Sequence, residues 1–201
     1  IMVVQTPLSA VDGLENKYNI AYQTVSTLYG LSWVLTPYVV KHRTDEKYSN
    51  LDKLVDKLML DTSKWVSGST VMGPKIYHIF HAADHLFAGR TSVIEDAFRK
   101  TLLDLKKGIF YKNSVGEPAA EVTFTTNFIR ANGEEPTLER HDELMMKYFD
   151  FVNDREFYPF LIRFNHNNNK VYSELEHFHP CWLNYNTMDD MIHSRGGPMI
   201  C

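Results

Sequence analysis

The apolar residues of the first half of the chain recur at spacings of three and four, the pattern of helices that bury one face. Pro37 stops the first of these stripes, and Pro74 stands at the start of the third, where a first helical turn accepts proline. The four stripes lie at residues 13–35, 51–58, 74–89 and 92–109. Amphipathic helices joined by short links predict a helical bundle.

The fourth predicted helix has a distinct start. Ser92 and Glu95 stand at the spacing of a capping box, in which the two side chains satisfy backbone N–H groups of the first turn. Four apolar residues behind it share one helical face, and we expect all of them to be buried. They are Phe98, Leu102, Leu105 and Ile109.

After residue 113 the period of the pattern changes. Large apolar residues alternate with polar ones over residues 122–128, which predicts a half-buried strand. Pro136 then begins a further predicted helix, whose apolar residues continue through Phe149 to Val152.

A hairpin is expected near the end of the chain. Its strands are residues 158–164 and 170–179, because asparagines at 167–169 tolerate the left-handed backbone that a tight turn requires. The fold class that we predict is therefore α+β: an N-terminal helical bundle of about four helices, followed by a small antiparallel sheet with one further helix.

Composition is that of one globular domain. About 200 residues, 44% of them hydrophobic, can bury a core without stabilising disulfides or metal ions. No linker or internal repeat divides the chain. We therefore expect a single domain over residues 1–201, with a helical half (1–112) and a mixed α+β half (113–201).

The only cysteines are Cys181 and Cys201, so a disulfide framework is not what holds the fold. No apolar run reaches the length of a membrane span, and the first residues lack the basic region of a signal peptide. These features predict a cytoplasmic protein without a membrane partner.

Charge is distributed unevenly between the two halves. Residues 1–112 carry 14 Lys and Arg against 11 Asp and Glu, and residues 113–201 carry 7 against 14. Neither half has the excess of basic residues that a dedicated nucleic-acid surface shows. If nucleic acid is a partner, the helical half is the better candidate.

Histidines form the first candidate site. His81 and His85 stand four residues apart on the third predicted helix, the spacing at which two imidazoles reach one metal ion. The zinc-peptidase pattern needs glutamate after the first histidine, and position 82 is alanine. The alternative is that the histidines belong to a solvated polar face, nearly opposite the apolar stripe.

The second candidate site lies in the last predicted strand. His177 and His179 point to one side of an extended strand, with Glu174 and Glu176 on the other. The two histidines can share a metal ion, and a nearby glutamate can serve as the base that a metal-bound water needs. A polar strand edge that faces water is the alternative.

One resemblance concerns the C-terminal part of the chain. Residues 160–165 are followed by Glu176-His177-Phe178-His179-Pro180 and by Arg195-Gly196-Gly197-Pro198. This succession resembles the C-terminal part of a family of uncharacterised bacterial proteins, over roughly 40 residues. The resemblance implies a prokaryotic or phage-associated setting, but no reaction and no site residues.

Two functions of different classes follow. The first is a non-catalytic component that binds a protein partner within a larger assembly, because the chain is dense in the aromatic residues and methionines that interfaces favour. The second is a hydrolase or nuclease that depends on a divalent transition metal. Its ligands would be His81, His85, His177 and His179, with Glu174 or Glu176 as the base. Whether the protein is an enzyme stays open at this point.

Overall fold

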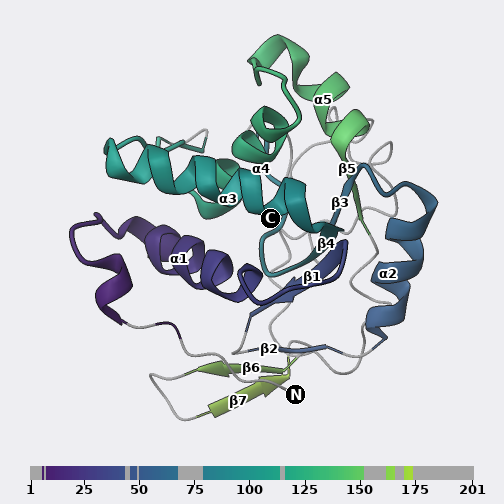
Figure 1. Ribbon diagram of the computed structural model, residues 1–201, viewed down its shortest axis with the longest axis horizontal. Coiled ribbons are helices and arrows are strands. Elements are labelled where there is room, and N and C mark those ends of the chain that lie inside the picture. Colours follow the sequence, from purple (N-terminus) through teal and green to yellow (C-terminus); the bar gives the residue numbers. More distant parts are fainter. Residues whose placement is uncertain are drawn as a thin grey trace, which may run out of the picture.

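The structure of the protein is a computed structural model that describes residues 6, 8–43, 46–48, 50–67, 79–113, 116–151, 162–165 and 170–173. A mixed four-stranded sheet lies between two layers of helices (Figure 1). One face is covered by α1 (Ile20–Leu31), α3 (Thr91–Lys106) and α4 (Ala120–Ala131), and the other by α2 (Leu51–Leu60).

The sheet is short and buried on both sides. Its spatial order is β1 (Tyr38–His42), β4 (Leu86–Arg90), β3 (Trp65–Ser67) and β5 (Phe149–Phe151). Strand β4 runs antiparallel to both neighbours, and β5 runs parallel to β3. Leu86 and Ala88 pack toward α2, whereas Phe87 packs toward the other layer, so every residue at the centre of β4 is buried.

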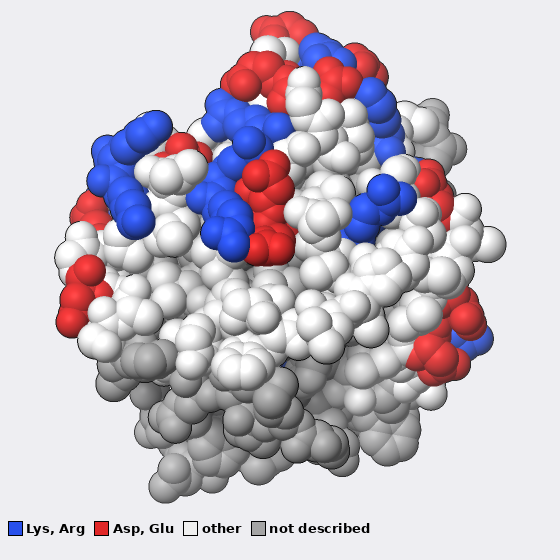
Figure 2. Space-filling model, viewed as in Figure 1, with Lys and Arg blue, Asp and Glu red and all other residues white. Residues whose placement is uncertain are grey.

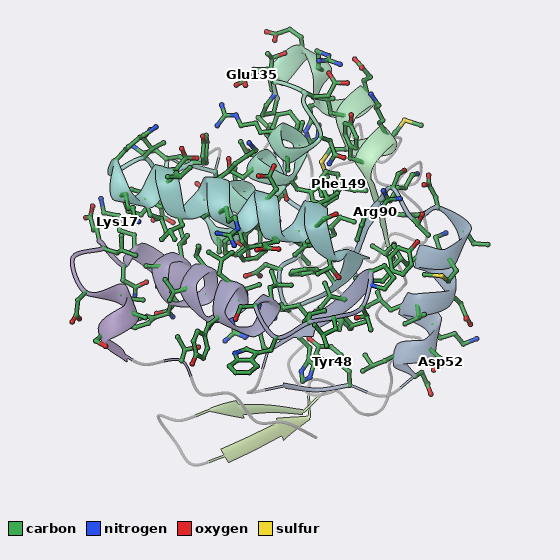
Figure 3. All side chains as sticks on the ribbon, viewed as in Figure 1. Lys17, Tyr48, Asp52, Arg90, Glu135 and Phe149 are labelled. Carbon is green, nitrogen blue, oxygen red and sulfur yellow. The ribbon has the colours of Figure 1, made fainter. Side chains whose placement is uncertain are left out.

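An aromatic core joins the sheet to α3 and α4. The ring of Trp65 stacks on Phe87 with centroids 3.8 Å apart, and Phe98 of α3 stacks on Phe124 of α4 at 4.6 Å. Phe149 joins the group where β5 meets α4 (Figure 3). Truncating one fully buried phenylalanine to alanine costs about 3 to 5 kcal/mol, so these contacts fix the position of α4 on the sheet.

Shorter elements complete the described chain. They are η1 (Leu8–Val11), η2 (Lys17–Asn19), η3 (Leu138–Arg140), α5 (His141–Tyr148) and a second sheet in the order β2 (Glu46–Lys47), β6 (Ile162–Asn165) and β7 (Lys170–Ser173). Strands β6 and β7 pair antiparallel, with Asn165 opposite Lys170. This confirms the predicted hairpin pairing; its turn, residues 166–169, lies outside the described residues.

The N-terminal half is not the predicted helical bundle. Its described part holds α1, α2 and α3, but also β1, β3 and β4. Residues 79–85 of the predicted third helix are not helical, and residues 86–90 form β4; residues 74–78 lie outside the described residues. The apolar stripe at residues 74–89 gave a wrong prediction because a strand covered on both faces is apolar throughout. Such a run fits a helical period as well as a strand period.

The strand predicted at residues 122–128 is also wrong, because this segment is helix α4. Every residue from Val122 to Ile129 is buried. A helix that meets packing partners all round has no polar face, so its sequence lacks the period that would identify it.

Other predictions need smaller corrections. Helices form as predicted near residues 51–58 and 92–109, but α3 ends at Lys106, so Ile109 lies beyond the helix and is exposed. Phe98 and Leu105 are buried as predicted, whereas Leu102 is only half-buried. The helix expected from Pro136 ends at Tyr148, and Phe149 begins β5.

Candidate metal centre

The segment that precedes β4 is held in an irregular conformation by hydrogen bonds to α5 and α4. The N–H of Phe80, a residue with a φ of 52°, donates to Nδ1 of the buried His141 at 3.2 Å. Two residues on, the N–H of Ala82 donates to Oγ1 of Thr125 in α4 at 3.0 Å. These bonds fix residues 80–85 against α4 and the sheet, so the side chains between them have defined positions.

Three side chains from this segment and from α4 converge. Asp84 and His85 stand just before β4, and Glu121 lies in the first turn of α4. Each offers one ligand atom, and the three atoms all lie within 4.8 Å of one another. One imidazole and two carboxylates are a donor set that suits zinc, manganese or iron.

Asp84 is the most unusual member of this cluster. Its side chain is 1% exposed, and neither carboxylate oxygen has a hydrogen-bond partner among the residues that the structure describes. Its Oδ1 atom lies 3.7 Å from Nε2 of His85. Burying a carboxylate without hydrogen bonds is costly, and a bound cation is one of the few groups that can offset this cost.

Glu121 shares this environment. Burial raises the pKa of its carboxyl group to about 7, and the nearby charge of Asp84 adds to the rise, while His85 and Arg43 act in the opposite direction. A divalent cation at the cluster would favour the ionised form of Glu121, which is the form that coordinates metal.

His81 lies at the margin of the cluster. Its Nε2 atom is 3.8 Å from Oε2 of Glu121, and its side chain is 5% exposed. Burial lowers the pKa of His81 to about 4, so the imidazole is neutral at pH 7 and the contact with Glu121 is not an ion pair. Neutral imidazole is the state that binds metal ions, which makes His81 a candidate fourth ligand.

The structure thus places His81 and His85 at one site, but not on the helix that their spacing predicted. Sequence reasoning missed Asp84, which stands between them, and Glu121, because the α4 segment was interpreted as a strand. The other predicted site residues lie outside the described residues, so their convergence with this cluster stays a prediction. They are Glu174, Glu176, His177 and His179.

A cavity of about 220 Å³ lies between the segment that precedes β4 and helix α4. Phe80 and Val122, the chain neighbours of His81 and Glu121, line it together with Lys112 and Arg130. Among the residues that the structure describes, its lining includes these two cationic side chains and no carboxylate.

Comparison of the chain with protein-family models, with curated proteins and with solved structures finds no match. Among the residues that the structure describes, no helix combines the length and apolarity that crossing a membrane requires. The interpretation of the cluster therefore rests on its own chemistry.

Proposed function

We propose that this protein is a metal-dependent hydrolase whose divalent ion is held by Asp84, His85 and Glu121. The observation that carries the proposal is the buried Asp84 carboxylate, which has no hydrogen bond from the described residues and shares a 4.8 Å neighbourhood with two further ligand atoms. A fully satisfied polar cluster would have no such need for a cation.

Three protein ligands are the usual set of a catalytic metal site, because they leave a coordination position for water. A bound ion lowers the pKa of that water toward 7 and so supplies hydroxide at neutral pH. A carboxylate that holds the ion through one oxygen can accept the proton through the other, and Glu121 is placed for this role. With an ion bound, the site would supply hydroxide to the electrophilic atom of a substrate, the bond to the leaving group would break, and Glu121 would give the proton that it holds to the leaving group.

The direct test is calorimetric titration of manganese and zinc into metal-free protein at neutral pH. We expect binding with a Kd below about 10 μM, weakened about 100-fold in Asp84→Asn. Asp96→Asn is the matched control, because Asp96 lies on the exposed side of α3, where it forms an ion pair with Lys100 at 3.5 Å. Binding no tighter than about 100 μM, or equal binding by both variants, would overturn the proposal.

The second candidate function is the non-catalytic one, association with a protein partner. Helix α1 supports it, because Tyr22 and Tyr29 lie on its outward side with Trp33 just beyond its end, 45%, 36% and 52% exposed. No charged residue occurs between Lys17 and Lys41. In Figure 2 the charged side chains gather mainly in the upper part of the view, and a broad uncharged band lies below them.

An uncharged face can meet a second copy of itself without like-charge repulsion, so self-association is the form of this candidate that we test. Sedimentation equilibrium at about 10 to 100 μM should detect a dimer that the variant Trp33→Ser weakens. A wild-type protein that stays monomeric over this range contradicts the candidate.

A further inference from the structure

The segment that carries the proposed metal ligands is tied to a histidine from a distant part of the chain. His141, the first residue of α5, is 2% exposed, and its Nδ1 atom accepts the N–H of Phe80 at 3.2 Å. The two rings also meet edge to face, with centroids 4.8 Å apart. A buried backbone N–H requires an acceptor, and the imidazole of His141 supplies it.

Phe80 has a backbone conformation that phenylalanine rarely adopts. Its φ of 52° lies in the left-handed region, where the Cβ atom of a residue other than glycine crowds the backbone. A residue stays in this region only when its surroundings hold it there. The hydrogen bond and the ring contact with His141 are two such restraints. If they were removed, we expect the φ of Phe80 to return to a negative value.

A change of φ at Phe80 would move one candidate ligand more than the others. His81 follows Phe80 directly in the chain. The next residue, Ala82, is attached to α4, because its N–H donates to Oγ1 of Thr125 at 3.0 Å. Asp84 lies beyond this second attachment. Loss of the first attachment should therefore displace His81 and leave Asp84 close to its present position.

The helix that carries His141 is itself well anchored. Helix α5 continues directly into β5, which pairs with β3 in the central sheet (Figure 1). Leu144 and Met145 of α5 are buried in the same core as the ring of Phe80. The imidazole of His141 is therefore held at a defined place relative to the sheet.

We propose that His141 is a positioning residue of the metal centre, whose hydrogen bond to Phe80 keeps His81 in place as a fourth ligand. The inference rests on the proposed hydrolase function, because it needs the ion. Nε2 of His81 lies 3.8 Å from Oε2 of Glu121. Ligand atoms about 2.1 Å from one ion are at most about 4.2 Å apart, so this distance fits a shared ion. Manganese prefers octahedral coordination, so a fourth protein ligand still leaves positions for water.

The experiment measures cobalt binding to metal-free protein by calorimetry and by visible absorption, which reports the coordination geometry of the ion. His141→Phe keeps a ring beside Phe80 but has no acceptor. We expect it to weaken cobalt binding about tenfold or more and to change the absorption spectrum. His141→Asn is the matched variant, because its Oδ1 atom stands as far along the side chain as Nδ1 does. It should restore the affinity and the spectrum of the wild type.

A double-mutant cycle separates positioning from a general loss of structure. If His141 acts through His81, His141→Phe should weaken cobalt binding in the wild type and cause no further loss in His81→Ala. A general loosening of the fold would lower the affinity of both backgrounds by the same factor, and that result overturns the inference. It is also overturned if His81→Ala binds cobalt as tightly as the wild type does.

The remaining outcomes distinguish this role of His141 from the proposed function. If cobalt binds the wild type no more tightly than about 100 μM, the hydrolase proposal falls. If cobalt binds and His141→Phe leaves affinity and spectrum unchanged, or if His141→Asn binds as weakly as His141→Phe, only the role of His141 is overturned. Should His141→Phe fail to fold, His141→Gln takes its place. Its oxygen lies one bond farther from Cβ than Nδ1 does, so it should weaken cobalt several-fold, and wild-type binding overturns the inference.

Discussion

The two ends of helix α4 each carry a glutamate, and the two carboxyl groups have opposite environments. Glu121 at the start is buried beside Asp84, and its pKa is raised to about 7, chiefly by burial. Glu134, just past the end, accepts hydrogen bonds from Lys147 at 2.7 Å and from Arg140 at 2.9 Å, which lower its pKa to about 2.

The two sites differ in whether the carboxylates have partners within the protein. The Glu134 cluster lies on the charged part of the surface, near Glu135 (Figures 2 and 3), and its carboxylate already has two cationic partners. The Asp84 and Glu121 pair is enclosed, and the described residues leave the Asp84 oxygens without a hydrogen bond. A bound cation would therefore compensate buried negative charge at the Asp84 and Glu121 pair, but not at Glu134. The following predictions test that contrast.

The largest expected effect is stabilisation by metal. Manganese at about 100 times its Kd should stabilise the folded protein by about 2.7 kcal/mol, because it binds the native state only. For a chain of this length the melting temperature should rise by about 5 to 10 °C in differential scanning calorimetry. The same rise is expected in Glu134→Gln, and none in Asp84→Asn. An equal rise in Asp84→Asn would show that the ion binds elsewhere.

Removing the buried charge should stabilise the metal-free protein. Asp84→Asn keeps the shape of the side chain and the bond from Lys41 to the backbone carbonyl, but it no longer buries a carboxylate without hydrogen bonds. We expect the free energy of unfolding in urea to increase by about 1 to 3 kcal/mol. A decrease of that size would mean that Asp84 holds the fold together as an ion-pair partner.

Glu121 and His81 should give opposite pH dependences of stability. The pKa of Glu121 rises from 4.5 to about 7 on folding, so its contribution is full below pH 4.5 and is lost as the pH rises through 7. The pKa of His81 falls from 6.5 to about 4, so its contribution is full above pH 6.5 and is lost as the pH falls through 4.

The two dependences offset each other in the metal-free wild type between pH 4.5 and 6.5. In Glu121→Gln only the His81 dependence remains, so the free energy of unfolding should rise by about 1 to 3 kcal/mol from pH 4 to 6.5. Urea titrations at several pH values measure this slope. A Glu121→Gln profile as flat as the wild type would contradict the assignment.

The smallest effect is expected at the surface cluster. Glu134→Gln removes hydrogen bonds and ion pairs with Arg140 and Lys147 at a solvated site, where such pairs contribute little. The free energy of unfolding should change little, and still less in high salt. A loss as large as that of a core substitution would show that this network supports the junction of α4 and α5.

The sequence alone determined the helices that have one exposed and one buried face. The stripes of α2 and α3 are visible because exposed positions are polar and buried positions are not. The capping box predicted at Ser92 and Glu95 is wrong, because α3 begins at Thr91 and its N-cap residue, Arg90, makes no side-chain capping hydrogen bond. The pairing of β6 with β7 was also predicted correctly.

The sequence also singled out His81 and His85 as candidate ligands. Their spacing was interpreted as that of two ligands on one helix, but this segment is not helical. The two histidines lie beside Glu121 because the segment before β4 packs against α4.

Only the tertiary structure decided the rest. Strand β4 and helix α4 are covered on all sides, so the spacing of their apolar residues does not identify them, and the first was predicted as a helix and the second as a strand. The metal centre depends on these two elements, because Glu121 meets Asp84 only when α4 packs on the sheet through Phe124 and Phe128. That packing is a property of non-local contacts, which local periodicity does not encode.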